Sequence, residues 1–396
     1  MSQHSIKSLR IVADENIPFV EEFFGDLGAV QRFPGRTLST EQLREADVLL
    51  VRSVTSVNRE LLEQTPVRFV GTCTIGTDHL DLDYLGRAEI EVASAPGCNA
   101  NAVVEYVFGV LARMRPDWQQ ARFGIIGCGN VGGALHRRLK DLGLTCACYD
   151  PFLDNASYPD LTELEVVLDC DVVCLHTPLT QSGSHPTFHL LGEPELEGLN
   201  SGTLLINAGR GAAIDNQALK RVLMRRHDLK VVLDVWEPEP LLDPDLLALV
   251  NGGSPHIAGY SYDGKVQGTA MIYQALCRFL DIEAEHSSAE LLAADPSSCQ
   301  PLVLRGDSAK DIINNALLDA FDVQEDDENL RATMTLSEEQ RAQAFDQLRK
   351  TYRKRRECHS LEIEYWPNGL SADEKKSLYQ QLTTLGFTLS MENPAG

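Results

Sequence analysis

The sequence predicts an α/β protein with two parallel-sheet domains of the Rossmann-like or flavodoxin-like kind and a small α+β domain after them. Three observations carry this prediction. Short apolar runs alternate with helix-length segments over two successive stretches, the second stretch opens on a glycine-rich turn, and the pattern changes near residue 290. Strands that alternate with helices are typical of βαβ units and a parallel sheet.

The first stretch spans about a hundred residues. Its predicted strands are 9–13, 48–51, 69–73 and 90–94, and its predicted helices are 19–27, 59–64 and 101–113. A later helix over 263–280 is expected to pack back onto this block. The first domain would then be discontinuous, with residues 1–100 and 260–288 forming it, residues 101–259 inserted, and a cleft between the two domains.

The second stretch repeats the alternation with clearer helix ends. Its predicted strands are 122–126, 145–149, 172–175, 203–206 and 231–235. Leu135 and Leu139 share one helical face, and Gly143 is suited to end that helix in the left-handed conformation. Asp215 is suited to cap the helix that follows it.

The third stretch, residues 289–396, carries no recognisable catalytic spacing. Strands are predicted at 301–304 and 361–365, helices at 309–321 and 338–356, and an acidic loop at 324–329. Apolar faces without catalytic residues favour a structural role or a subunit contact rather than catalysis.

Composition excludes several classes of partner. The chain has 396 residues, 43% of them hydrophobic, and a formal net charge of −23. So acidic a surface argues against nucleic acid and anionic membrane as partners. No apolar run is long enough to span a membrane, and the first ten residues lack a secretory signal. The ten cysteines have no zinc-type spacing, which predicts a reduced cytoplasmic protein without a metal site.

A G-x-G-x-x-G pattern follows the first predicted strand of the second stretch. Gly127 permits a tight turn, Gly129 lets the backbone approach a pyrophosphate, and Gly132 permits close helix–strand packing. Asn130 and Val131 begin the helix, whose N-terminus faces the phosphates. The G-x-G-x-x-G pattern alone is weak evidence for dinucleotide binding. The predicted strand before the loop and the predicted helix after it supply the structural context that such binding requires.

Asp150, at the end of the next predicted strand, indicates which dinucleotide binds. A carboxylate there accepts bonds from the ribose hydroxyls and repels a 2′-phosphate, and residues 151–154 contain no Arg or Lys. NAD is therefore favoured over NADP. Thr177 is placed to line the nicotinamide side, whereas His176 is interpreted as structural.

Three further polar residues each follow a strand-like apolar run. They are Arg210, a glutamate at Glu237 or Glu239, and His256. Ligands of open α/β sheets bind at the carboxyl ends of strands. An arginine fork grips a carboxylate, a histidine moves a proton near neutral pH, and a glutamate holds that histidine.

These motifs together resemble the D-isomer-specific 2-hydroxyacid dehydrogenases. The segments that carry the resemblance are Gly127-Cys128-Gly129-Asn130-Val131-Gly132, His176-Thr177-Pro178, Ile206-Asn207-Ala208-Gly209-Arg210-Gly211, Asp234-Val235-Trp236-Glu237-Pro238-Glu239-Pro240 and Pro255-His256. The resemblance implies that Arg210 binds the substrate carboxylate, that His256 takes the proton of the C2 hydroxyl, and that Glu239 rather than Glu237 holds His256. It also implies cofactor contacts from Ala208, Gly209, Asp234 and Gly259.

Other segments are similar to the branch of this family that acts on phosphorylated sugar acids in vitamin B6 synthesis. They include Val51-Arg52-Ser53-Val54-Thr55, Gly71-Thr72-Cys73-Thr74-Ile75-Gly76 and His256-Ile257-Ala258-Gly259-Tyr260. This branch implies oxidation of 4-phospho-D-erythronate to (R)-3-hydroxy-2-oxo-4-phosphooxybutanoate, with Ser53, Thr74 and Tyr260 at the substrate. It also implies that residues 289–396 form the dimerisation domain of a homodimer. Arg52, just past a predicted strand, is the expected cation for the phosphate.

Two alternatives remain open at this point. A relative that oxidises 3-phosphoglycerate or glycerate would carry the same Arg210, Glu239 and His256. An NAD-sensing corepressor of the same family would bind protein and need no turnover.

Overall fold

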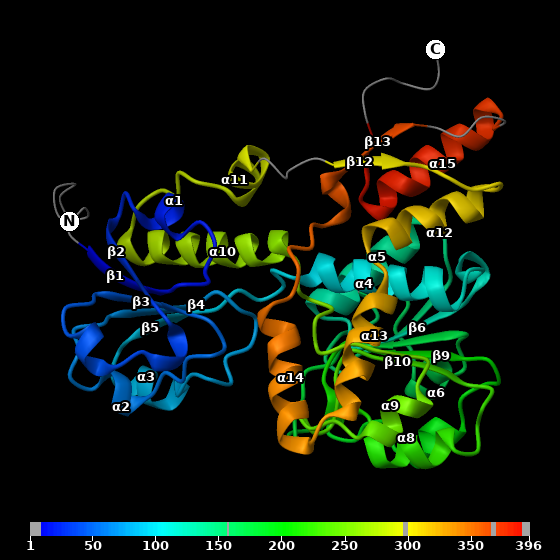
Figure 1. Ribbon diagram of the computed structural model, residues 1–396, viewed down its shortest axis with the longest axis horizontal. Coiled ribbons are helices and arrows are strands. Elements are labelled where there is room, and N and C mark those ends of the chain that lie inside the picture. The colour runs from blue at the N-terminus through cyan, green and yellow to red at the C-terminus, as the bar shows by residue number, and fades with distance from the viewer. Residues whose placement is uncertain (1–8, 157, 296–299, 366–369, 390–396) are drawn as a thin grey trace. The chain divides into compact units, whose positions relative to one another are not determined.

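The computed structural model describes residues 9–156, 158–295, 300–365 and 370–389. The chain splits into two compact units, one of residues 1–99 and 261–298 and the other of residues 100–260 and 299–396. Each unit is built on its own parallel sheet (Figure 1). The prediction of two parallel-sheet α/β domains is therefore confirmed, as is the return of the helix after residue 260 to the first block.

The first unit contains a five-stranded sheet in the order β2-β1-β3-β4-β5. Its strands are β1 (Leu9–Asp14), β2 (Gly28–Phe33), β3 (Val48–Val51), β4 (Phe69–Thr72) and β5 (Glu91–Ala93), and its α-helices are α1 (Val20–Phe24), α2 (Arg59–Leu62), α3 (Leu82–Arg87), α10 (Tyr262–Leu280) and α11 (Ser288–Ala294). The sequence analysis did not predict β2 or α3. β2 is an edge strand without a fully buried residue, so it lacks the apolar run of the inner strands.

Alternate residues of these strands supply two cores. Ile11 and Leu50 pack with α1 and α10 on one face of the sheet. Val12 and Leu49 pack on the opposite face with α2 and α3. The inner strands of a parallel sheet covered on both faces are buried, which explains their continuous apolar runs in the sequence.

The second unit contains a six-stranded parallel sheet in the order β11-β10-β9-β8-β6-β7. Its strands are β6 (Phe123–Ile126), β7 (Cys146–Tyr149), β8 (Val172–Leu175), β9 (Leu204–Asn207), β10 (Lys230–Leu233) and β11 (Gly252–Gly253), and its α-helices up to residue 260 are α4 (Ala100–Met114), α5 (Asn130–Asp141), α6 (Leu164–Leu168), α7 (Glu193–Glu197), α8 (Asn216–Leu223) and α9 (Pro244–Leu249).

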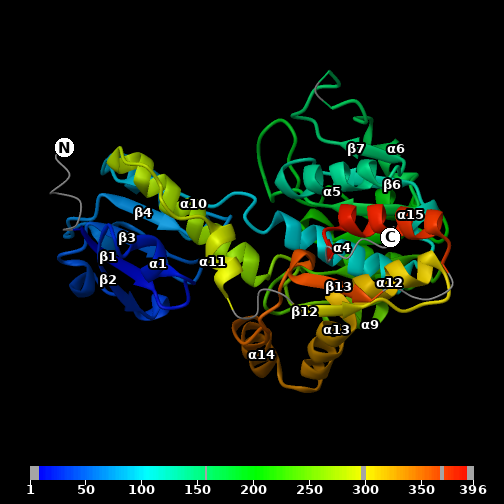
Figure 2. The ribbon, with the colours of Figure 1, turned by 90° about the horizontal axis from the view of Figure 1, so that it is seen from above.

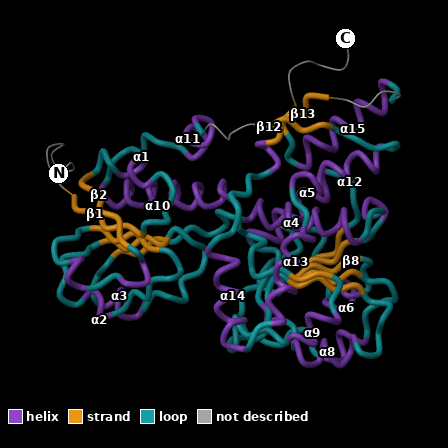
Figure 3. The backbone as a smooth tube through the Cα atoms, viewed as in Figure 1, coloured by secondary structure: helices purple, strands orange, loops and turns teal. Residues whose placement is uncertain are grey.

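Helices cover both faces of this sheet as well (Figure 3). One core joins α4 and α5 to residues such as Ile125 and Ile206, and the other joins α6, α8 and α9 to Ile126 and Leu205. Gly143 adopts φ 76° just after α5, as predicted. The Asp215 carboxylate accepts the N–H groups of the first turn of α8, which confirms the predicted cap.

The C-terminal segment folds against this second unit rather than apart from it. Its described residues contain a parallel three-stranded sheet in the order β12-β13-β14 and four α-helices. The elements are β12 (Gln300–Val303), α12 (Ala309–Ala320), α13 (Val323–Ala332), α14 (Glu338–Lys350), β13 (Leu361–Tyr365), α15 (Ala372–Leu385) and β14 (Thr388–Leu389). α12 and α15 lie beside α4 and α5 (Figure 2).

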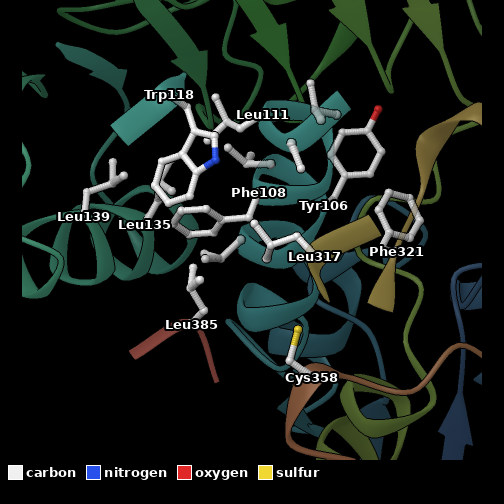
Figure 4. Close-up of a cluster of buried hydrophobic side chains, with 14 of the residues drawn as sticks. Tyr106, Phe108, Leu111, Trp118, Leu135, Leu139, Leu317, Phe321, Cys358 and Leu385 are labelled. Carbon is white, nitrogen blue, oxygen red and sulfur yellow. The ribbon is translucent and has the colours of Figure 1, made fainter. Parts of the chain in front are cut away.

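Apolar side chains of this segment complete the cores of the unit. Leu317, Phe321 and Leu385 pack with Tyr106 and Phe108 of α4 (Figure 4). On the other face of the sheet, Leu330 of α13 and Phe345 of α14 join the second core. The segment is therefore part of the folded unit that carries the six-stranded sheet.

The prediction of an acidic loop at 324–329 is wrong, because these residues lie within α13. Asp322 caps the helix by accepting the N–H of Gln324. Glu325 and Asp326 in the first turn favour a helix N-terminus through the helix dipole. Buried Leu330 anchors the helix to the core. Its acidic residues are typical of a solvated loop, and the buried face of the helix is limited to Val323, Asp326 and Leu330.

No helix in the described part of the chain is long and apolar enough to cross a membrane.

Candidate active site

The polar residues singled out in the second stretch all follow strands of the six-stranded sheet. The glycine loop follows β6, Asp150 follows β7, and Thr177 comes two residues after β8. Arg210 follows β9, and the loops after β10 and β11 carry Glu239 and His256. Because these strands are parallel, all the loops lie at one edge of the sheet.

The glycine loop has the geometry that dinucleotide binding requires. Gly127 adopts φ 87°, and a Cβ on Gly132 would lie 1.9 Å from the Gly127 carbonyl oxygen. Gly129 is exposed, and a Cβ there would meet nothing within 4 Å. The loop therefore leaves open space over Gly129, at the N-terminus of the twelve-residue helix α5.

Asp150 connects the turn after β7 to the glycine loop. One of its oxygens accepts the backbone N–H of Cys128 at 2.9 Å, and the other accepts that of Phe152 at 3.1 Å. These bonds hold the carboxylate beside the loop. An acidic group held there suits ribose hydroxyls and disfavours a 2′-phosphate.

Two buried polar side chains beside the glycine loop lack partners among the residues that the structure describes. They are the Thr177 hydroxyl and both ring nitrogens of His176. Burial lowers the pKa of the His176 imidazole to about 4, so the ring is neutral at pH 7. Buried polar atoms are normally satisfied, so unpaired ones here, with the open glycine loop, fit a bound NAD.

Glu239 and His256 form a hydrogen-bonded pair. The Nδ1 atom of His256 lies 2.8 Å from Oε2 of Glu239, while Oε1 accepts the backbone N–H of Trp236 at 3.0 Å. Burial raises the pKa of Glu239. This effect is outweighed by the hydrogen bond from His256 and the charge of that ring, by the Trp236 N–H, and by the charge of Arg349. The net pKa is lowered, and Glu239 is a carboxylate at neutral pH.

The rival carboxylate Glu237 has a different partner. Its oxygens lie 2.8 and 3.0 Å from Nε2 of His189. With Asp215 these two side chains form a group whose potential metal-ligand atoms all lie within 4.8 Å of one another. The structure thus separates two Glu–His pairs, Glu239–His256 and Glu237–His189.

Asp234 fixes the loop that carries His256. It is 1% exposed, and its carboxylate accepts the Ser254 hydroxyl at 2.7 Å and the N–H groups of Ile257 and Ala258 at 2.8 and 3.0 Å. His256 itself has φ 57°. Sequence reasoning placed Asp234 at the cofactor and missed this role, for which its position at a strand end gave no signal.

The Arg210 loop lies close to the loop after β10. A Cβ on Gly211 would lie 1.9 Å from the Trp236 carbonyl oxygen, so only glycine allows this approach. The Asn207 side chain accepts the Gly209 N–H at 3.1 Å and donates to the Arg210 carbonyl at 3.0 Å. Half-buried Arg210 is therefore held on an ordered turn that also contains Ala208.

Two arginines of the C-terminal segment approach this site, and neither is among the predicted site residues. Arg355 is 4% exposed and donates to the carbonyl oxygens of Ala258, at 3.2 Å, and Ala102, at 2.7 Å. Arg349 lies 5.7 Å from the centre of the Tyr260 ring. Tyr260 follows Gly259 in the loop after His256, so both arginines flank that loop.

The other predicted substrate residues belong to the first unit. Arg52 and Ser53 follow β3, and Thr74 follows β4. The Thr74 hydroxyl lies 2.7 Å from that of Thr72, which in turn lies 3.0 Å from Nε2 of His79. These groups gather at the carboxyl edge of the five-stranded sheet, and their roles stay predictions.

Comparisons with known proteins define the class. A family model described as D-isomer specific 2-hydroxyacid dehydrogenase, NAD binding domain, matches residues 108–258. The fold is shared with D-lactate dehydrogenase of Aquifex aeolicus in complex with NAD and lactic acid (TM-score 0.57, 23% identity, 68% of this chain and 95% of that chain). It is also shared with NAD-bound 3-phosphoglycerate dehydrogenase of Entamoeba histolytica (TM-score 0.57, 22% identity, 70% and 97%). The protein is an NAD-dependent oxidoreductase of the 2-hydroxyacid dehydrogenase class, with NAD as its cofactor.

Curated relatives narrow the class to one family. Erythronate-4-phosphate dehydrogenase of Cellvibrio japonicus is 52% identical over 96% of this chain and 99% of its own length. The enzymes of that name from Teredinibacter turnerae and Marinobacter nauticus are each 46% identical, over 96% of this chain and 99% and 100% of theirs. The chain belongs to the erythronate-4-phosphate dehydrogenase family. A domain of unknown function, DUF3410, matches residues 295–386.

Proposed function

We propose that this protein oxidises 4-phospho-D-erythronate at C2 to (R)-3-hydroxy-2-oxo-4-phosphooxybutanoate, in pyridoxine 5′-phosphate synthesis. The names of its relatives support the substrate. The observation that carries the chemistry is the Glu239–His256 pair at the sheet edge that also bears the glycine loop. NAD, when bound, accepts the hydride that leaves C2.

His256 is the proposed general base. Glu239 is a carboxylate and can only accept a hydrogen bond, so Nδ1 of His256 carries the proton between them. In a neutral ring the other nitrogen, Nε2, then has a free lone pair. That atom takes the proton of the C2 hydroxyl as the hydride departs, and Glu239 stabilises the imidazolium that forms.

Arg210 is the proposed ligand of the substrate carboxylate. A guanidinium grips a carboxylate through two parallel hydrogen bonds, which fixes C2 as well as C1. Its charge also stabilises the oxygen at C2 as the hydroxyl becomes a carbonyl. Arg210, Glu239 and His256 together are the proposed catalytic residues.

The cofactor is proposed to lie along the same sheet edge. The pyrophosphate would meet the N-terminus of α5, and Asp150 would accept bonds from the adenosine ribose. Thr177 offers a buried hydroxyl with no partner among the described residues. The full proposed set is Gly127, Gly129, Asn130, Val131, Gly132, Asp150, Thr177, Ala208, Gly209, Asp234 and Gly259.

Ser53, Thr74, Arg52 and Tyr260 are proposed to bind substrate. The domains we propose are 1–100 with 260–288 for substrate, 101–259 for NAD and 289–396 for dimerisation. Large hydrophobic side chains exposed in the last region, such as Val303 at 57%, support a homodimer contact there. The free thiols of buried Cys146, Cys148 and Cys174 support a reducing cytoplasm.

A substrate panel tests the proposal. NADH formation is followed with 4-phospho-D-erythronate, 3-phosphoglycerate, glycerate and erythronate, and the oxo acid is identified by mass spectrometry. We expect the highest kcat/KM for 4-phospho-D-erythronate. A higher value for 3-phosphoglycerate or glycerate would assign the protein to another substrate, and NAD binding without turnover of any acid would indicate a binding protein.

A further inference from the structure

The C-terminal segment brings an arginine to the neighbourhood of the catalytic pair. Phe345 of α14 is buried in the core of the second unit, and Arg349 lies one helical turn later on the same face. The Arg349 guanidinium lies 5.9 Å from the centre of the Phe345 ring and 5.7 Å from that of Tyr260. It is thus held between two rings by cation–π contacts.

Arg349 differs from Arg331 and Arg353 in having no polar partner among the residues that the structure describes. Arg331 binds Asp327 and two carbonyl oxygens, and Arg353 binds Glu325 at 2.8 Å. The Arg349 side chain forms no hydrogen bond or ion pair with any residue that the structure describes, and its Nε atom is buried. A half-buried guanidinium with five unused donors is a suitable receptor for an anion.

The position of this cation relates it to the reaction. Its charge lowers the pKa of Glu239, so the two groups interact electrostatically although they form no ion pair. The ring that it covers, Tyr260, comes four residues after His256. Arg349 is therefore a cation beside the Glu239–His256 pair. It comes from the C-terminal segment, which has no recognisable motif of catalytic residues.

We propose that Arg349 binds the phosphate of the substrate and so selects phosphorylated acids. This inference rests on the proposed function. The substrate carries two anionic groups in a protein of formal net charge −23, so each needs a local cation. Arg210 takes the carboxylate next to C2, which leaves the phosphate at C4 for Arg349 in addition to Arg52, whose role stays a prediction. Arginine suits phosphate through bidentate hydrogen bonds, and stacking on Tyr260 orients the fork.

The test compares phosphorylated and unphosphorylated erythronate in the full-length wild type, Arg349→Gln and Arg349→Lys. We expect Arg349→Gln to lower kcat/KM for the phosphorylated acid about ten-fold or more, through KM, because charged hydrogen bonds are lost. Activity on unphosphorylated erythronate should change little, and competitive inhibition by inorganic phosphate should weaken. Arg349→Lys keeps the charge but not the fork, and should retain an intermediate preference.

Arg341→Gln is the matched control, because Arg341 lies about 12 Å earlier along the same helix. It should behave as wild type. An equal loss on both acids, with lower kcat and a shifted pH profile, would show that Arg349 tunes Glu239 and would overturn the inference. So would full preference for the phosphorylated acid in both Arg349 variants. A wild type that ignores 4-phospho-D-erythronate would instead remove the proposed function, and the inference with it.

Discussion

The two units share a parallel-sheet architecture, but the loops at the carboxyl edges of their sheets differ. In the second unit these loops are bound to one another: Asp150 holds the glycine loop, Asp234 holds the His256 loop, and Gly211 lies against Trp236. In the first unit, Arg52 and Ser53 precede Val54, which is exposed. The buried Thr55 hydroxyl has no partner among the described residues, and one of the two Asp14 carboxylate oxygens also has none.

The second unit is distinguished by a second layer of bonds around the proposed catalytic residues. The proposed reacting groups of the second unit are oriented by Asp234, Trp236 and Asn207, none of which is expected to touch substrate. Such support holds catalytic side chains near their productive geometry. The first unit has one such chain of bonds, from Thr74 through Thr72 to His79, and leaves the Thr55 hydroxyl without a partner among the described residues.

The largest difference between the units should appear when the C-terminal segment is removed. Truncation after residue 298 takes Leu317, Phe321 and Phe345 out of the cores of the second unit. Each such loss costs about 2–5 kcal/mol, and a whole domain is stable by only about 5–15 kcal/mol.

We therefore expect the second unit to unfold, which would leave monomers or aggregates. Amide hydrogen exchange protection should remain in β1, β3 and β4 of the first unit. Light scattering and amide exchange measure both results. A truncated protein that still forms a dimer would remove the dimerisation role. Intact protection of β6 and β8 would show that the segment is not part of that core.

A substitution at the cofactor end should have the next largest effect. Asp150→Ala removes the proposed ribose partner and the carboxylate that repels a 2′-phosphate. We expect NAD affinity to fall about ten-fold or more, with a smaller gap to NADP. Titration of both dinucleotides measures this, with Asp141→Ala at the far end of α5 as control. A wild type that prefers NADP would contradict the account of Asp150.

The smallest expected effect tests the binding role of the first unit. Arg52→Ala should raise the KM for 4-phospho-D-erythronate about ten-fold and leave NAD affinity nearly unchanged. Arg68→Ala is the control, because Arg68 precedes β4 and lies at the opposite edge of the same sheet. If Arg52→Ala retains the full preference for the phosphorylated acid, the phosphate is held without this residue.

Much of the fold was predictable because buried parallel strands are short, continuous apolar runs. β3 and β13 have the predicted bounds, and the glycine loop could be identified from its place between a strand and a helix. The choice of Glu239 over Glu237 rested on the family resemblance. In the structure Glu239 bonds His256 and Glu237 bonds His189.

The remaining features depend on contacts between distant segments. Arg349 and Arg355 lie about a hundred residues beyond His256, within a basic, polar stretch that is indistinguishable from a solvated helix face. The packing of Phe345 and Phe321, together with the bonds of Arg355 to backbone carbonyl oxygens, brings these arginines to the loop that carries His256. The second bonding layer around Asp234 was missed for the same reason, because its partners are backbone N–H groups that have no sequence signature.

The central claim is that His256, held by Glu239, moves the proton at C2. The most direct test compares His256→Ala with His189→Ala, since His189 forms the other Glu–His pair. Turnover of 4-phospho-D-erythronate and NAD affinity are measured in both. We expect His256→Ala to lose about 10²–10⁴-fold in turnover with NAD affinity retained, and His189→Ala to lose only a few-fold. Unchanged turnover in His256→Ala would contradict the account.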